Sequence, residues 1–266
     1  MMVYLRTGLM LIAALALVAC QATDKLTRSD ESQYSDEQPR ESYLNSPAYI
    51  NVQLAVEYMK QKEFGLAMSK LKKALAYNPN LAVAHSTIAV LYEELGETGP
   101  ARHHYERSIE LDSRDPRLRN NYGQFLCRNG QEQAGIQQFD IAAKNPLYES
   151  PQIPLINAGS CAMKIQKLDE AEAYFRSALN KQPQNSIALL NMVRLSAGSG
   201  NYFQARAYLQ RYVAVAKHTA ETLWAGYQIE KNMGDKEAAA NYAVRLKSRF
   251  PDSPQTKELL KEITDR

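Results

Sequence analysis

The sequence predicts an all-α protein: six stacked helix-turn-helix units followed by a capping helix. Small residues flank a large one on a single helix face, as in Ala171, Phe175 and Ala178. Copies of this pattern recur at steps of 34, 34, 36, 34 and 34 residues. A fixed period of this size indicates a helical array. No region shows the apolar/polar alternation of a hairpin strand.

Composition fits this prediction and excludes some functions. The chain has 266 residues, 45% of them apolar, and a formal net charge of +3. That balance is ordinary for a folded protein and gives no argument for nucleic-acid binding. The sequence also lacks a glycine-rich phosphate loop, so no cofactor and no small-molecule substrate is expected.

The N-terminus, residues 1–19, reads as a secretory signal. Arg6 precedes an apolar run from Leu9 to Ala19, and these eleven residues fall short of the roughly 20 needed to cross a bilayer. The run ends at Ala19-Cys20 in a pattern that resembles the lipobox of bacterial lipoprotein precursors. That resemblance implies cleavage before Cys20 and its acylation, and Gln21 in place of Asp favours the outer membrane. An ordinary signal peptide with a chance cysteine is the alternative.

Residues 20–47 are expected to form a lipidated cysteine and a flexible polar tether. The stretch from Gln21 to Ser46 is rich in Ser, Asp, Glu, Gln and Thr. Such a composition cannot bury enough apolar surface to offset its ordering entropy. A coil of this length spans about 28 Å.

The repeats occupy residues 48–253, and their pattern resembles the tetratricopeptide repeat. The predicted units are 48–81, 82–115, 116–149, 152–185, 186–219 and 220–253. Small residues let paired helices approach to about 8–10 Å, and large partners fill the groove between them. The two extra residues after the third unit fall in a proline-rich stretch, which predicts a loop. Residues 254–266 place Leu259, Leu260 and Ile263 on one side, as a capping helix requires.

The resemblance to this repeat family implies a concave surface lined by first-helix positions 2, 5, 9 and 12. These positions are apolar at the start of the array, which predicts a protein-binding site. The predicted site residues are Tyr49, Val52, Val56, Met59, Val83 and Val90. The alternative is a cap in which the segment around Tyr43 and Leu44 folds back over the strip. The single tryptophan, Trp224, is expected to pack in the core or at the end of the array.

Two cysteines other than Cys20 are 34 residues apart. Cys127 and Cys161 fall in successive first helices, which are neighbours in such an array. Since an exported protein meets an oxidising compartment, a disulfide between them is predicted, with two buried thiols as the alternative.

No catalytic residue and no metal site is predicted. The four histidines (His85, His103, His104 and His218) lack the spacing of a zinc-binding set. Nothing resembles a nucleophile elbow or a cysteine–histidine dyad, so an enzyme is not expected.

The whole arrangement resembles the outer-membrane tetratricopeptide lipoproteins of type IV pilus biogenesis, the pilotins for the pilus secretin. The resemblance rests on Cys20, the polar tether, six repeats, the cap and the Cys127/Cys161 pair. It implies a lipid-anchored scaffold on the periplasmic face of the outer membrane, with the secretin as protein partner. The alternatives are an adaptor for peptidoglycan hydrolases, an assembly factor for barrel proteins, or a structural spacer.

Overall fold

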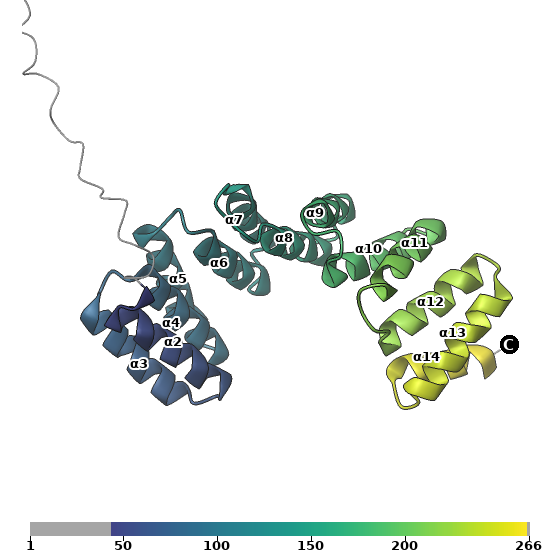
Figure 1. Ribbon diagram of the computed structural model, residues 1–266, viewed down its shortest axis with the longest axis horizontal. Coiled ribbons are helices and arrows are strands. Elements are labelled where there is room, and N and C mark those ends of the chain that lie inside the picture. Colours follow the sequence, from purple (N-terminus) through teal and green to yellow (C-terminus); the bar gives the residue numbers. More distant parts are fainter. Residues whose placement is uncertain (1–43, 265–266) are drawn as a thin grey trace, which may run out of the picture. The chain divides into compact units, whose positions relative to one another are not determined.

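A computed structural model describes residues 44–264, so the predictions for residues 1–43, including acylation of Cys20, lie outside the described part. Within residues 44–264 the chain forms thirteen α-helices and no strand (Figure 1). The first helices of the six units are α2 (Pro47–Lys60), α4 (Ala82–Glu94), α6 (Pro116–Arg128), α8 (Gln152–Lys164), α10 (Ser186–Gly198) and α12 (Ala220–Asn232). The second helices are α3 (Phe64–Tyr77), α5 (Thr98–Leu111), α7 (Glu132–Lys144), α9 (Leu168–Lys181), α11 (Tyr202–Val213) and α13 (Lys236–Arg249). A final helix, α14 (Pro254–Thr264), follows.

This architecture confirms the predicted fold class. Each first helix packs most closely on the second helix of its own unit, and each first helix also touches the next one. None of the described helices is long and apolar enough to cross a membrane.

The turn inside each unit requires the same unusual backbone conformation. Four units place a glycine there with positive φ, at Gly96, Gly130, Gly200 and Gly234. The first and fourth units instead have Lys62 (φ 62°) and Gln166 (φ 59°) at the equivalent position. Because glycine alone enters this region without a steric penalty, the period is less visible at those two turns.

Helix starts follow from local capping. Pro47 and Pro116 each lie in the first turn, where a missing N–H costs nothing. The Asp115 side chain accepts from the backbone N–H of Arg117, and Thr219 forms a capping box with Thr222.

The core lies between the helices of successive units. Small residues at the helix crossings are fully buried, and aromatic or leucine side chains fill the space beside them. The largest core cluster includes Phe139, Phe175 and Met192 and spans the third to sixth units. The prolines Pro146 and Pro151 lie in the loop between α7 and α8, and Pro154 lies in the first turn of α8.

The capping helix α14 buries less than predicted. Leu259 and Thr256 are buried, but Leu260 and Ile263 are each 49% exposed, so the three predicted apolar residues do not share one packed side. Hydrogen bonds between α14 and α12 add to this packing. The Glu262 carboxylate accepts hydrogen bonds from the Tyr227 hydroxyl (2.6 Å), the Gln228 amide (2.9 Å) and the Lys231 ammonium (2.6 Å).

Candidate functional site

The predicted groove begins with first-helix residues of units one and two, on α2 and α4. Tyr49, Met59, Val83 and Val90 are half-buried, and Val56 is 37% exposed. Their accessible parts contribute apolar surface. Met59 and Val83 also pack against the core of the first unit, so the surface rests on a fixed support.

Val52 does not belong to this surface. The side chain is only 4% exposed and packs with Ala84 and Ile88 of α4 in the first core cluster. The prediction that Val52 faces a partner is therefore wrong. The reason is general, because position 5 lies where adjacent first helices meet. Ser86, Asn120 and Ile156, which occupy it in the next three units, are also buried.

The apolar surface ends at position 12 of the second unit, where Glu93 belongs to an ion-pair and hydrogen-bond network. Glu93 of α4 accepts two hydrogen bonds from the Arg128 guanidinium (3.1 and 3.0 Å) and one from the Tyr105 hydroxyl (2.6 Å). Burial, together with the bond to Glu93, raises the pKa of Tyr105 well above its usual value. The phenol stays protonated and holds Glu93 in place, so α4, α5 and α6 are joined at this point.

Farther along the array, hydrogen bonds and an ion pair join successive first helices. The Asn121 amide donates to the Ser86 hydroxyl (3.3 Å), and the Asn157 amide donates to the Asn120 carbonyl oxygen (2.9 Å). Arg194 of α10 pairs with Glu221 of α12 at 2.6 Å. Hydrogen bonds and an ion pair therefore cross the predicted groove surface in units three to five, although Ile153 and Ile187 leave apolar side chains 42% and 58% exposed there.

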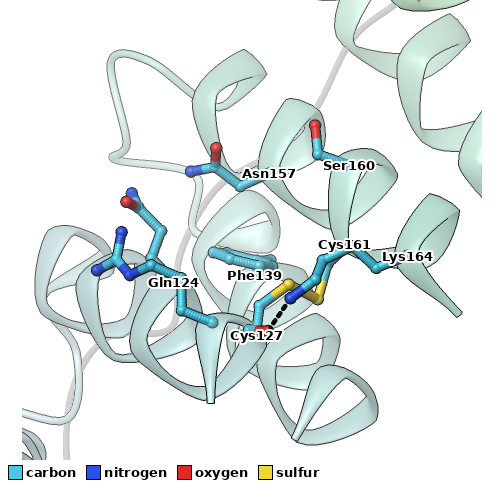
Figure 2. A pocket seen from close by; sticks show the side chains of 8 residues that line it. Gln124, Cys127, Phe139, Asn157, Ser160, Cys161 and Lys164 are labelled. Atoms are coloured by element: carbon cyan, nitrogen blue, oxygen red, sulfur yellow. Dashed lines mark hydrogen bonds between the residues drawn. A yellow bond between two sulfur atoms is a disulfide. The ribbon is translucent and has the colours of Figure 1, made fainter. Parts of the chain in front are cut away.

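A small open pocket of about 150 Å³ lies between α6 and α8, beside a disulfide (Figure 2). The Cys127 and Cys161 sulfurs are bonded, with Cα atoms 5.9 Å apart. The Lys164 ammonium donates to the Cys127 carbonyl oxygen (2.6 Å) and lies 3.4 Å from the Glu132 carboxylate. The lining residues are Gln124, Cys127, Arg128, Phe139, Asn157, Ser160, Cys161 and Lys164.

The accessible lining of this pocket is mainly apolar, and most of its polar groups already form hydrogen bonds within the array. Gln124, Asn157 and Ser160 offer amides and a hydroxyl, and Lys164 is already engaged. No side chain in the lining forms a nucleophile–base pair, because both cysteines are joined to each other.

The histidines give one contact that the sequence does not reveal. The Nδ1 atoms of His85 and His104 lie 3.0 Å apart, and His85 Nε2 lies 3.1 Å from the Pro79 carbonyl oxygen. Since a carbonyl only accepts, His85 carries its proton on Nε2 and accepts from His104 at Nδ1. Burial lowers the pKa of His104 to about 4. In residues 44–264 no group of three metal-ligating side chains is placed to hold an ion.

Trp224 packs near the end of the array, as predicted. The indole is half-buried on the last core cluster and stacks on Tyr227 with ring centroids 5.4 Å apart.

Helical pairs of this geometry, with an apolar groove on the first helices, define a class of protein-binding array. Three stretches of the chain match the tetratricopeptide-repeat family, at residues 82–115, 104–137 and 162–225. The chain belongs to the tetratricopeptide-repeat proteins.

Comparison with individual proteins narrows this class. The chain is 27% identical over 257 residues to the type IV pilus assembly protein PilF of Pseudomonas aeruginosa, covering 97% of this chain and 98% of PilF. It is 33% identical over 122 residues to a Haemophilus influenzae protein, covering 46% of this chain and 68% of that one. The crystal structure of PilW, a widely conserved type IV pilus biogenesis factor, superposes with a TM-score of 0.73 at 29% identity, covering 81% of this chain and 99% of PilW. The chain is thus a tetratricopeptide-repeat protein homologous to the type IV pilus biogenesis factors PilF and PilW.

Proposed function

We propose that this protein is a lipid-anchored scaffold of the outer membrane for type IV pilus biogenesis. In this role it binds the pilus secretin and promotes its localisation and multimerisation there. The observation that carries the proposal is the homology to PilF, which extends over almost the full length of both chains. The accessible apolar surface on α2 and α4 supports a protein partner.

In this proposal the groove binds the secretin, and the acylated Cys20 holds the protein at the outer membrane. Val56 and Met59 offer a valine and a flexible methionine at neighbouring turns of α2, which suits a peptide or helix with apolar side chains. The Glu93–Arg128 pair marks one boundary of this surface. Acylation of Cys20 would hold the array at the periplasmic face of the membrane.

A pull-down from detergent-solubilised membranes tests the proposal, with the chain from residue 21 as bait and mass spectrometry of what binds. We expect recovery of the secretin, and its loss when Val56 is replaced by glutamate. Val244→Glu is the matched control, since Val244 is 60% exposed on α13 and outside the groove. Recovery of peptidoglycan hydrolases or barrel-assembly proteins instead would keep the scaffold and reject the pilus role.

The anchor requires a separate test. Cys20→Ser should move the protein from the membrane fraction to the soluble periplasmic fraction, and the secretin should lose its outer-membrane location. Unchanged fractionation would reject the lipid anchor.

A further inference from the structure

The helix α3 is one of two second helices, with α11, that have basic residues and no acidic one. Between Phe64 and Tyr77 the helix has three lysines (Lys70, Lys72 and Lys73) and no acidic residue. By contrast, α9 has the acidic residues Asp169 and Glu170 in its first turn, and its Arg176 forms an ion pair with Glu172. The first unit therefore presents a positive face that is not balanced within its own helix.

The helical period sets these lysines around an exposed apolar stripe. Ala67, Leu71 and Ala74 are fully buried and define the inner side of α3. At about 100° per residue, Leu66, Lys73 and Tyr77 lie together on one lateral side of α3, about 90–130° from the centre of the buried side, with Lys70 and Lys72 on its two flanks. Leu66 is 48% exposed and Tyr77 is 56% exposed.

The three ammonium groups are available for an external partner. Among residues 44–264, the side chains of Lys70, Lys72 and Lys73 form no hydrogen bond and no ion pair. Lys62 in the preceding turn is also exposed and adds a fourth positive charge near the N-terminal end of α3.

We propose that the outer face of α3 docks on the surface of a phospholipid bilayer with anionic headgroups. Lysines whose alkyl stems lie along apolar surface while their charges reach phosphate are typical of interfacial helices, and tyrosine is favoured at headgroup depth. The exposed Leu66 and Tyr77 between the lysines favour a lipid surface over a purely polar acidic protein. The chain also enters the array at this unit, directly before α2 and α3.

This contact goes beyond the proposed function. It uses a second helix, whereas the groove is built from first helices, and it requires neither an acyl chain nor the secretin. Such docking would fix the orientation of the first unit against the membrane that the anchor reaches.

The test uses the chain from Leu44, because residues from Leu44 onward form a compact unit that holds all of the core clusters described above. Binding is measured by co-sedimentation with vesicles of phosphatidylcholine alone, or with about a third phosphatidylglycerol. We expect binding to the anionic vesicles only. Neutralising Lys70, Lys72 and Lys73 with glutamine should lower the partition coefficient about a hundredfold, roughly fivefold for each lysine.

The matched control removes the same charge elsewhere. Lys247, Lys257 and Lys261 are exposed on α13 and α14, and replacing them by glutamine should leave vesicle binding unchanged. Circular dichroism verifies that both triple variants keep their helices. A separate Leu66→Ser/Tyr77→Ser variant should also lose binding, since the apolar stripe enters the interface.

Four results would overturn the proposal: no binding to anionic vesicles, full binding of the α3 triple variant, an equal loss in the control variant, or binding of polyglutamate as tight as that of the vesicles. None of them bears on secretin recovery in the pull-down. Failure of this inference is therefore distinguishable from failure of the proposed function.

Discussion

Replacing Gly135 by alanine tests how closely α6 and α7 must approach. Gly135 of α7 faces Gly123 of α6 across the third unit. A Cβ on Gly135 would lie 2.7 Å from the Gly123 carbonyl oxygen and 3.1 Å from the Cys127 backbone nitrogen. Both contacts are backbone atoms, so no side chain can rotate away, and the two helices must separate instead.

The magnitude follows from two opposing terms. Overpacking of a tight core costs about 1–3 kcal/mol, and a backbone clash belongs to the upper part of that range. The higher helix propensity of alanine returns about 1 kcal/mol in a helix interior. We therefore expect Gly135→Ala to lower the free energy of unfolding by about 1–2 kcal/mol.

Gly99→Ala is the matched control. Gly99 lies in the first turn of α5, and a Cβ there would meet nothing within 4 Å. This change should raise the free energy of unfolding by about 0.5 kcal/mol. The two variants should differ in melting temperature by roughly 3–10 °C, given 2–4 °C per kcal/mol for a unit of this size.

The assay is urea unfolding followed by circular dichroism, with hydrogen exchange of amides in α6 and α7 to report local opening of the array. If Gly135→Ala unfolds at the same urea concentration as Gly99→Ala, or at a higher one, then close contact between α6 and α7 does not limit stability and the packing argument is wrong.

Three further predictions concern covalent and ionisable links. Replacing both Cys127 and Cys161 by alanine should cost about 3–4 kcal/mol, because the closed loop is long; thermal melts with and without reductant check this, and a reductant effect on the double variant would contradict it. Burial by itself would raise the pKa of Glu262, but hydrogen bonds from Lys231, Tyr227 and Gln228 outweigh it and lower the pKa to about 2. The stabilisation is therefore complete above about pH 4.5 and is lost as pH falls toward 2, and Glu262→Gln should remove this part of the pH dependence in melts. Burial holds the pKa of His104 at about 4, against about 6.5 when unfolded, so stability should decline as pH falls from 6.5 to 4. A His104→Gln variant that shows the same decline would exclude this histidine as its source.

The repeat period predicts where the helices begin and end, because nearby residues in the chain determine these boundaries. Predicted units start at residues 48, 82, 116, 152, 186 and 220, and the observed first helices start at Pro47, Ala82, Pro116, Gln152, Ser186 and Ala220. Proline and glycine act within a single turn of chain, so their positions are readable without tertiary information.

The site is less predictable because it depends on contacts between units. Val52 is apolar and occupies a position assigned to the groove, yet α4 covers it. His85 and His104 are 19 residues apart and meet only because α4 and α5 pair. Glu93 falls at position 12 of the second unit, which could have been identified from the period, but its bond to Arg128 could not.

Within residues 44–264, the two ends of the array differ in how much apolar surface they leave exposed. Ile50 and Leu54 are 43% and 41% exposed on α2, whereas residues at the same unit positions in later units, such as Leu118 and Met192, are buried, and there the preceding second helix contacts the first helix. No helix within residues 44–264 precedes α2 and packs on it, whereas α14 packs on α12 and α13 at the C-terminal end of the array. Ile50, Leu54 and Val56 all belong to α2, so among residues 44–264 the first unit offers a continuous accessible apolar surface, which favours a binding role for it.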